Sequence, residues 1–400
     1  MAKGFAPSEQ EQSSRSSSSR TLQPTLLEEI KALDDPRTKR KPDHLLVDIV
    51  AIGILATLAG ADNMVAVATY GQEEYEWLST FLDLPNGIPS HDTFSRVFGL
   101  IEPDQFNQFF LRWIKHVSEQ LDIQLIHLDG KTLRGSYDRE SPLKALHSVS
   151  AWSSEHHLVL AQQRVDEKSN EITAIPELLK LMDIKQSIIT IDAMGTQREI
   201  ARQIIKEGAD YILALKANHG NLYKSVKTFF KKAVETDWDG IEYRYDDGTS
   251  AGHYRIEYRQ VWVVPIAQIP NLANAKKWPG FKSIVMVRRK RTLWNGETDK
   301  PAYYISSLEA DAALIAHSIR SHWSIENGLH WVLDVTFNED HSRIRMGHGP
   351  ENVALLRRLC INLIKQHPSK DSIATKRFRA ALSREFLLEL LSLPQSKDSD

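Results

Sequence analysis

Two short apolar runs in this chain each end on an aspartate, and this pattern constrains the fold more than any other feature. Asp129 follows the run LIHL (125–128), and Asp192 follows SIITI (187–191). Burying a lone carboxylate is costly, so an acid at the end of a buried strand is unusual. Such strands, interleaved with helical segments, are typical of an α/β protein. We therefore expect both aspartates to end neighbouring strands of one sheet.

A third acid, Glu326, lies in the aromatic-rich stretch HWSIENGLHWVLDV (322–335), which has helical periodicity. Two strand-end aspartates and one helical glutamate offer the oxygen ligands that Mg²⁺ prefers. Two-metal phosphoryl transfer on nucleic acid requires such a set. The sequence therefore predicts Asp129, Asp192 and Glu326 as catalytic residues and metal ligands, with two Mg²⁺ ions as cofactors and Mn²⁺ as a substitute.

Each of these acids also has a simpler interpretation. Asp129 and Asp192 are equally typical of turns at strand ends, and Glu326 of the polar face of a packed helix. His322, Glu326 and His330 recur every four residues on one helical face, which makes zinc binding an alternative, although no cysteine accompanies them. Three nearby acids compete with Glu326 for the third position: Asp334, Glu339 and Asp340.

Patterning divides the 400 residues into four segments. The Ser-rich residues 1–22 are expected to be disordered, and 23–118 to form an N-terminal helical domain that is a candidate for DNA binding. From 121 to 366 the pattern predicts an α/β catalytic domain with an RNase H-like mixed sheet, interrupted by a β-rich insertion at about 238–308. Residues 367–400 are expected to be a helical segment and a polar tail.

The residues after Asp192 predict a helix. Thr196 and Glu199 have the spacing of a capping box, and Gly208 suits the C-terminus of that helix. The next strand, YILALK (211–216), is expected to end at the same sheet edge as Asp192.

The net charge of −2 does not by itself indicate a DNA-binding protein, but local clusters do. Residues 276–300 hold eight Lys or Arg and residues 342–384 hold ten, which favours phosphate binding. A solvated surface is the alternative for either cluster. The predicted DNA contacts lie in these clusters or beside the acids: Lys131, Arg134, Lys216, Asn218, Arg288, Arg289, Arg291, His322, Arg343 and Arg345.

The single cysteine, Cys360, excludes an internal disulfide and fits a reducing compartment. No secretory signal is visible at the N-terminus. The longest apolar run, residues 49–61, is too short to span a bilayer. We expect a cytoplasmic, nucleoid-associated protein with no membrane partner.

Seven segments occur in a specific order between about residue 30 and residue 366: PSHDTFSRV, HLDGKTLRGS, KSNEITAIPELL, TIDAMGTQREIA, YILALKANHGNL, HWSIENGLHWVLDVTFNED and RIRMG…ENVALLRRLCINLIK. Together they resemble bacterial insertion-sequence transposases of the DDE class, specifically the H-repeat-associated (ISAs-type) family. The resemblance implies the catalytic triad Asp129, Asp192 and Glu326 on an RNase H-like core with an N-terminal helical domain. It also implies cleavage at the element's ends, strand transfer into target DNA, and a homo-oligomer on DNA.

One departure from the wider insertion-sequence group concerns its Tyr-x₂-Arg-x₃-Glu-x₆-Lys signature. The corresponding positions here are Ile319, His322, Glu326 and Leu333. The arginine and lysine that would grip the element's end are absent, and the sequence does not show which residues replace them. Two alternative functions remain: a nuclease without strand transfer, and a catalytically silent DNA-binding remnant of a mobile element.

Overall fold

A computed structural model describes residues 24–37, 42–119, 121–136, 145–165, 169–252, 255–293 and 296–391. The predicted Ser-rich tail at 1–22 and the last nine residues of the predicted polar tail lie outside these ranges.

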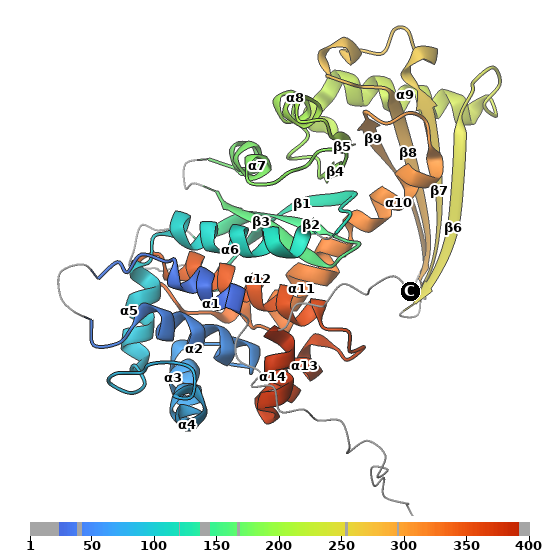
Figure 1. Ribbon diagram of the computed structural model, residues 1–400. Helices are drawn as coiled ribbons and strands as arrows, with labels where there is room; N and C mark the ends of the chain where they lie inside the picture. The colour runs from blue at the N-terminus through green and yellow to red at the C-terminus, as the bar shows by residue number, and fades with distance from the viewer. Residues whose placement is uncertain are drawn as a thin grey trace, which may run out of the picture.

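A nine-stranded mixed sheet forms the centre of the molecule, in the order β3-β2-β1-β4-β5-β9-β8-β7-β6 (Figure 1). Strands β1, β4 and β5 are parallel, whereas β2 and β3 run antiparallel as a meander at one edge. The predicted α/β class with an RNase H-like core is therefore confirmed. The strands are β1 (Leu125–Thr132), β2 (His147–Ser153), β3 (Leu158–Arg164), β4 (Ile188–Ile191), β5 (Asp210–Leu215), β6 (Arg244–Gly252), β7 (Arg255–Pro265), β8 (Ser283–Leu293) and β9 (Gly296–Ser306).

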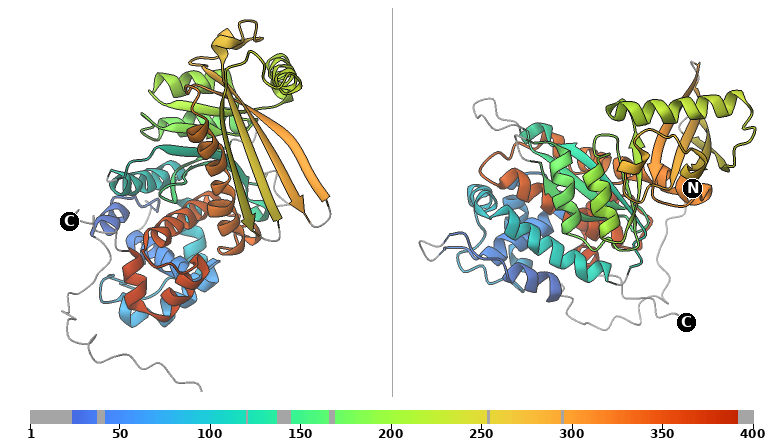
Figure 2. Two further views of the ribbon diagram at one scale, coloured as in Figure 1. Left: turned by 90° about the vertical axis from the view of Figure 1, so that its right-hand side faces the viewer. Right: turned by 90° about the horizontal axis from the view of Figure 1, so that it is seen from above.

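The β-rich insertion continues the core sheet. Strand β9 pairs antiparallel with β5, and β8, β7 and β6 follow outward as long strands (Figure 2). The parallel core would otherwise leave the backbone groups of β5 unpaired at its edge, and pairing with β9 satisfies them. Sequence pattern shows that these segments are strands but not which edge they join.

Helices cover both faces of the sheet (Figures 1 and 2). Ile189 and Leu213 belong to the large core cluster, whereas Ile188 and Ile212 pack with Ile315 in a second cluster, because successive strand residues alternate between faces. One face carries α7 (Glu171–Lys180), α8 (Arg198–Lys206) and α9 (Gly220–Glu235), and the other carries α6 (Pro103–Ser118), α10 (Ala312–His322) and α12 (Gly349–Gln366).

The N-terminal helices pack with the last helices of the chain beneath the sheet (Figure 1). Helix α12 is buried along nearly its whole length between them and β3. In the described part of the chain, no helix is long and apolar enough to cross a membrane. The remaining helices are α1 (Pro24–Lys31), α2 (Leu46–Leu58), α3 (Met64–Glu73), α4 (Tyr75–Leu78), α5 (His91–Leu100), α11 (Trp331–Val335), α13 (Ile373–Leu382) and α14 (Arg384–Leu391).

Candidate active site

The parallel pairing of β1 with β4 brings the two predicted aspartates together. Leu128 lies opposite Ile191 in this ladder, so the next residues, Asp129 and Asp192, lie side by side where β4 ends. Asp129 Oδ1 accepts a hydrogen bond of 3.0 Å from the backbone N–H of Gly130. The two acids lie on adjacent parallel strands as expected, but only Asp192 follows a strand end: β1 continues through Asp129 to Thr132, because it remains paired with β2.

The loop after β4 holds Asp192 in place. Asp192 Oδ1 accepts hydrogen bonds from the backbone N–H groups of Met194 (2.9 Å) and Gly195 (3.2 Å). The same loop is tied to the neighbouring strand end, because the Asn218 amide donates to the Ala193 carbonyl at 2.6 Å. Asn218 was predicted as a DNA contact, which stays a prediction; in the structure its amide supports the Asp192 loop.

The capping-box prediction is wrong. The Thr196 hydroxyl donates to the backbone carbonyls of Asp192 (3.0 Å) and Ala214 (2.7 Å), and α8 has no side-chain cap. Thr196 therefore joins the ends of β4 and β5 rather than starting a helix with Glu199. Gly208, with φ +78°, follows the end of α8 as predicted.

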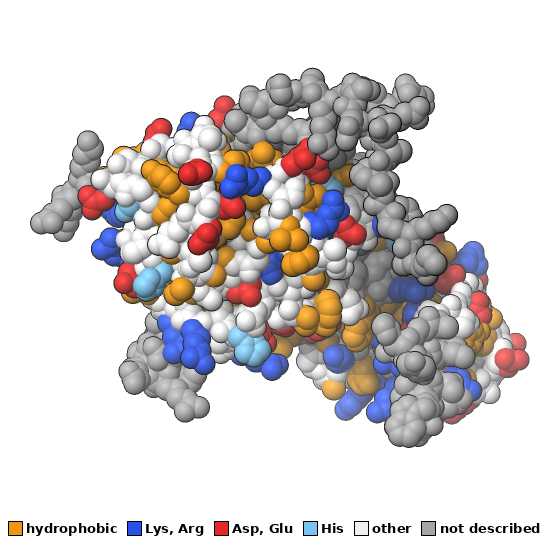
Figure 3. All heavy atoms as spheres, turned by 90° about the horizontal axis from the view of Figure 1, so that it is seen from below, with side chains coloured by type: hydrophobic (Ala, Val, Ile, Leu, Met, Phe, Trp, Pro, Cys, Tyr) orange, Lys and Arg blue, Asp and Glu red, His pale blue; other side chains and the backbone are white. Residues whose placement is uncertain are grey.

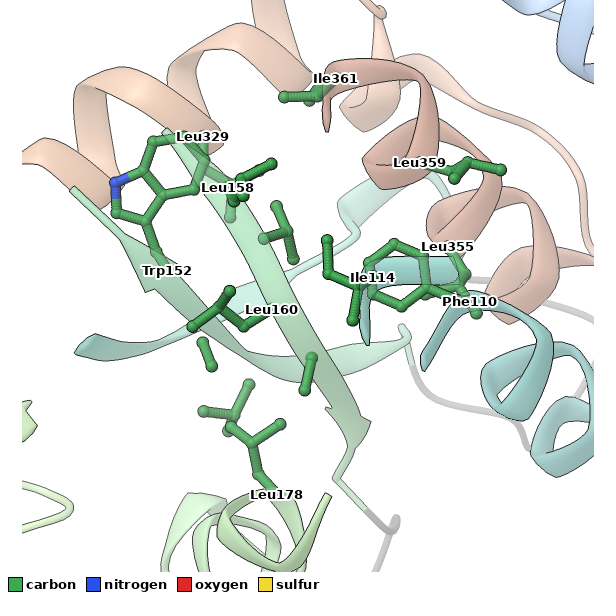
Figure 4. Close-up of a cluster of buried hydrophobic side chains, with 14 of the residues drawn as sticks. Phe110, Ile114, Trp152, Leu158, Leu160, Leu178, Leu329, Leu355, Leu359 and Ile361 are labelled. Carbon is green, nitrogen blue, oxygen red and sulfur yellow. The ribbon is translucent and has the colours of Figure 1, made fainter. Parts of the chain in front are cut away.

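Glu326 begins a single π-helical turn, η6 (Glu326–His330), between α10 and α11. Such turns often occur at functional sites. The Trp152 indole N–H donates to the Ser324 hydroxyl at 3.0 Å, and a Cβ at Gly328 would lie 2.9 Å from the Trp152 ring. Figure 4 shows Leu329 beside Trp152 in the same buried cluster. These contacts fix the turn against β2 and direct Glu326 toward β1.

Asp129, Glu326 and His330 converge on one point. Each offers a ligand atom, and these atoms lie within 4.8 Å of one another. His330 Nδ1 lies 3.2 Å from Glu326 Oε2 and 3.6 Å from Asp129 Oδ2. Burial raises the pKa of Asp129 to about 7, assisted by the charges of Asp192 and Glu326. Asp192 is thus part of the same electrostatic centre, although it lies outside the tighter group of three.

No lysine or arginine within the described ranges forms an ion pair with Asp129, Asp192 or Glu326, and His330 contacts only Asp129 and Glu326 among them. Burial lowers the pKa of His330 to about 3, so this ring is neutral at pH 7 and cannot balance the carboxylates. A set of oxygen ligands and one imidazole without a compensating cation fits a divalent metal ion.

The two histidines flanking Glu326 differ in position. His330 is only 5% exposed and lies inside the site, whereas both were expected at its edge. His322 Nδ1 is 2.7 Å from the Thr190 hydroxyl, which also lies 2.6 Å from His127 Nδ1. Burial lowers the pKa of His322 to about 4. The hypothesised zinc trio therefore does not assemble in the described structure, and the ring nitrogen of His322 faces the sheet rather than a DNA surface.

A second acidic cluster lies next to the site and is neutralised by cations. Lys131 Nζ lies 2.5 Å from Asp334, 3.2 Å from Asp340 and 3.9 Å from Glu339, and Arg358 donates to Glu339 at 3.1 Å. Lys131 is 8% exposed, so its predicted contact with DNA conflicts with its burial. The three competing acids are committed to these ion pairs.

The predicted basic strand β8 borders a cleft of about 600 Å³ that reaches Glu326. Arg288 pairs with Asp299 at 2.7 Å, and Arg291 pairs with Glu257 at 2.5 Å. The Arg289 guanidinium lies 5.3 Å from the centre of the Trp323 ring. Other side chains that line the cleft are Glu257, Arg259, Arg320 and Asn327.

Other predicted DNA contacts are exposed. The Arg134 side chain is 84% exposed, and Lys216, Arg343 and Arg345 are exposed as well. On the lower face of the molecule, basic, acidic and apolar side chains are interspersed (Figure 3), so the charge on that face is mixed.

Sequence reasoning missed Glu171, the first residue of α7. Its carboxylate lies 2.8 Å from His147 Nε2, and a Cβ at Gly130 would lie 2.0 Å from Glu171 Oε1. Glycine at position 130 therefore makes room for a further acid beside Asp129. Asn170 caps α7. This residue indicates in the sequence that a helix begins there, but it does not indicate that the helix begins close to Asp129 in space.

Comparisons with known proteins agree over most of the chain. Residues 120–363 match a family model described as the transposase DDE domain, and residues 27–114 match one described as DDE_Tnp_1-associated. YncI of Escherichia coli O157:H7, provisionally named a transposase, is 39% identical over 92% of this chain and 94% of its own length. YhhI of E. coli K12, provisionally named an H repeat-associated transposase, is 37% identical over 92% of this chain and 97% of its own. A solved piggyBac transposase synaptic complex with hairpin DNA covers 94% of this chain and 81% of its own, at 12% identity and a TM-score of 0.41.

Proposed function

Because this chain belongs to the transposase DDE domain family, we propose that it cuts DNA at the ends of an insertion sequence and joins those ends to target DNA. Water attack would break a phosphodiester bond and leave a free 3′-hydroxyl, which would then attack a phosphodiester of the target. The convergence of Asp129 and Glu326, with Asp192 next to Asp129 at the end of β4, supports this proposal most strongly.

Asp129, Asp192 and Glu326 would hold the metal ions. When bound, two Mg²⁺ ions, or Mn²⁺ in their place, supply activation of the attacking oxygen and stabilisation of the leaving oxygen. The protein's part is to keep the ligands in place before DNA arrives. Asp192 is fixed by two backbone N–H groups, and Glu326 by the turn that packs on Trp152.

DNA would approach along the cleft between β6–β8 and α10, since this cleft ends at Glu326. Arg289 and Trp323 face each other there. Exposed Arg134, Lys216 and Arg343 would neutralise phosphates outside the cleft. We further propose that the helices within 23–118 contribute to DNA binding and that the protein acts as a homo-oligomer on nucleoid DNA.

A cleavage assay with a duplex carrying the element's end tests the proposal. With Mg²⁺ and a target plasmid, the full chain should release the end and join it to the plasmid. Asp129→Asn should abolish both steps, whereas the matched control Asp334→Asn, in the neutralised cluster, should retain them. Cleavage without joining would identify a nuclease, and DNA binding without cleavage would identify a silent remnant.

A further inference from the structure

Two buried polar atoms beside the site have no hydrogen-bond partner in the described structure: His330 Nε2 and Glu339 Oε2. His330 is 5% exposed and Glu339 is fully buried. Buried polar groups nearly always find partners. Glu339 Oε2 lies 3.9 Å from Lys131 Nζ and belongs to the neutralised cluster, which leaves Nε2 of His330 to be explained.

The other ring nitrogen of His330 faces the site. Nδ1 lies 3.2 Å from Glu326 Oε2 and 3.6 Å from Asp129 Oδ2. A neutral imidazole carries its proton on one nitrogen and a lone pair on the other. With the proton on Nδ1, Glu326 gains a donor, and the buried Nε2 is left with a lone pair that no donor satisfies. With the proton on Nε2, the ring directs its Nδ1 lone pair between two carboxylates.

The second tautomer places a lone pair and two carboxylates around one point, which is unfavourable unless a cation binds there. The geometry points to His330 as a nitrogen ligand: we propose that Nδ1 binds the metal ion held by Asp129 and Glu326. This inference rests on the proposed function, because it adds a ligand to the same metal centre.

A mixed ligand set has a consequence for metal preference. Mg²⁺ favours oxygen ligands and retains several waters, whereas imidazole nitrogen suits transition-metal ions, and affinity for these rises from Mn²⁺ toward Zn²⁺. The position formed by Asp129, Glu326 and His330 should therefore bind Mn²⁺ more tightly than Mg²⁺. The position nearer Asp192, for which the described structure offers no such nitrogen, should show less preference.

Pulsed electron paramagnetic resonance on the full chain with less than one equivalent of Mn²⁺ tests this proposal without any DNA. The wild-type protein should show the hyperfine coupling of a directly bound ¹⁴N. The coupling should disappear in His330→Gln and persist in the matched control His322→Gln, whose ring lies four residues before Glu326 rather than after it.

The outcomes separate this inference from the proposed function. Mn²⁺ that binds to the wild-type chain and is lost in Asp129→Asn, but shows no ¹⁴N coupling, would overturn the role of His330 and leave the carboxylate centre standing. Coupling that persists in His330→Gln would equally overturn it. Absence of any Mn²⁺ binding by the wild-type chain would contradict both. Absence of ¹⁴N coupling from the wild-type spectrum would overturn the role of His330 even if the His330 variant does not fold.

Discussion

Asp129 and Lys131 lie two residues apart on β1 and face the same side of the sheet, yet their surroundings are opposite. Lys131 is a buried cation that meets three carboxylates, whereas Asp129 is a carboxylate that meets Glu326 and a neutral histidine. Two strand residues span about 6.6 Å, and four helical residues span about 6 Å. The distance from Asp129 to Lys131 along β1 therefore matches the distance from His330 to Asp334 along η6 and α11. The number of acids does not distinguish the cluster around Asp129 from the cluster around Lys131. The difference is that a protein cation neutralises the second cluster, whereas the first has none and can accept a metal ion.

The largest expected effect comes from removing a charge from the uncompensated cluster, which is formed by Asp129, Glu326 and His330. Asp129→Asn should lower Mg²⁺-dependent cleavage of element-end DNA roughly 10³-fold or more, because a lost ligand forfeits several kcal/mol of transition-state stabilisation. Asp334→Asn should change cleavage less than about tenfold, since Asp334 pairs with Lys131. Rates from single-turnover assays provide the comparison. Equal losses in the two variants would mean that both clusters serve catalysis.

Sequence alone anticipated the uncompensated cluster in part. Asp129 and Asp192 could be predicted as neighbours because an apolar run that closes on an acid is a local pattern, and parallel strands bring such positions side by side. Glu326 could not be separated from Asp334, Glu339 and Asp340 by pattern. Which acid is neutralised depends on where Lys131 and Arg358 lie in three dimensions, and these are far from the acids in the sequence.

The second prediction concerns the compensated cluster, in which Lys131 lies among Asp334, Glu339 and Asp340. Lys131→Met should lower the free energy of unfolding by about 3 kcal/mol, because it leaves buried carboxylates without a cation. The matched control Arg134→Met removes an exposed cation, 84% accessible, and should change stability by less than about 0.5 kcal/mol. Urea unfolding of both variants measures the difference. If Lys131→Met is as stable as the wild type, the ion pairs of this cluster contribute nothing to the fold.

The third prediction uses the pKa of Asp129, which burial raises from 3.8 to about 7. Between these values the folded state holds a proton that the unfolded state has lost, so the metal-free protein should lose stability as pH rises from about 4 to about 7. The shift corresponds to at most about 4 kcal/mol. Because the side chain is 28% exposed, solvent screening should reduce the fall to about 2 kcal/mol.

Unfolding by urea in chelator at pH 5 and pH 8 measures this fall. Asp129→Asn lacks the titrating group, so the difference in pH dependence between wild type and variant isolates its contribution. Saturating Mg²⁺ at pH 8 should restore the lost stability in the wild type only. A wild-type protein whose stability matches the variant's at both pH values would show that the cluster carries no unbalanced charge.

The fold, like the candidate site, could be predicted only in part from the sequence. Strand identity and the parallel order of β1, β4 and β5 follow from apolar runs alternating with helices. The extension of the sheet by β9, β8, β7 and β6 was not predictable, because their pattern does not encode which edge they join. The ion pairs of β8 were missed for the same reason: Arg288 and Arg291 find their partners, Asp299 and Glu257, on adjacent strands.

The smallest expected effect concerns basic residues, which can also be divided into those with an acidic partner and those without one. Arg343 and Arg345 are exposed, and in the described structure neither has an acidic partner, whereas Arg288 and Arg291 already hold Asp299 and Glu257. Each phosphate contact contributes about 0.9 to the slope of log affinity against log salt concentration. Replacing Arg343 and Arg345 with Gln should therefore flatten the slope by about 1.8.

The matched pair Arg288→Gln and Arg291→Gln should flatten the salt slope less, because an arginine that is held by a carboxylate brings little unbalanced positive charge to a phosphate. Affinity for a duplex of the element's end, measured by fluorescence anisotropy from low to moderate salt, gives both slopes. A larger change for the β8 pair would show that DNA displaces Asp299 and Glu257 from their arginines. In that case charge balance in the free protein would predict the metal centre but not the DNA-binding surface, and the comparison between neutralised and unbalanced clusters would apply to buried groups only.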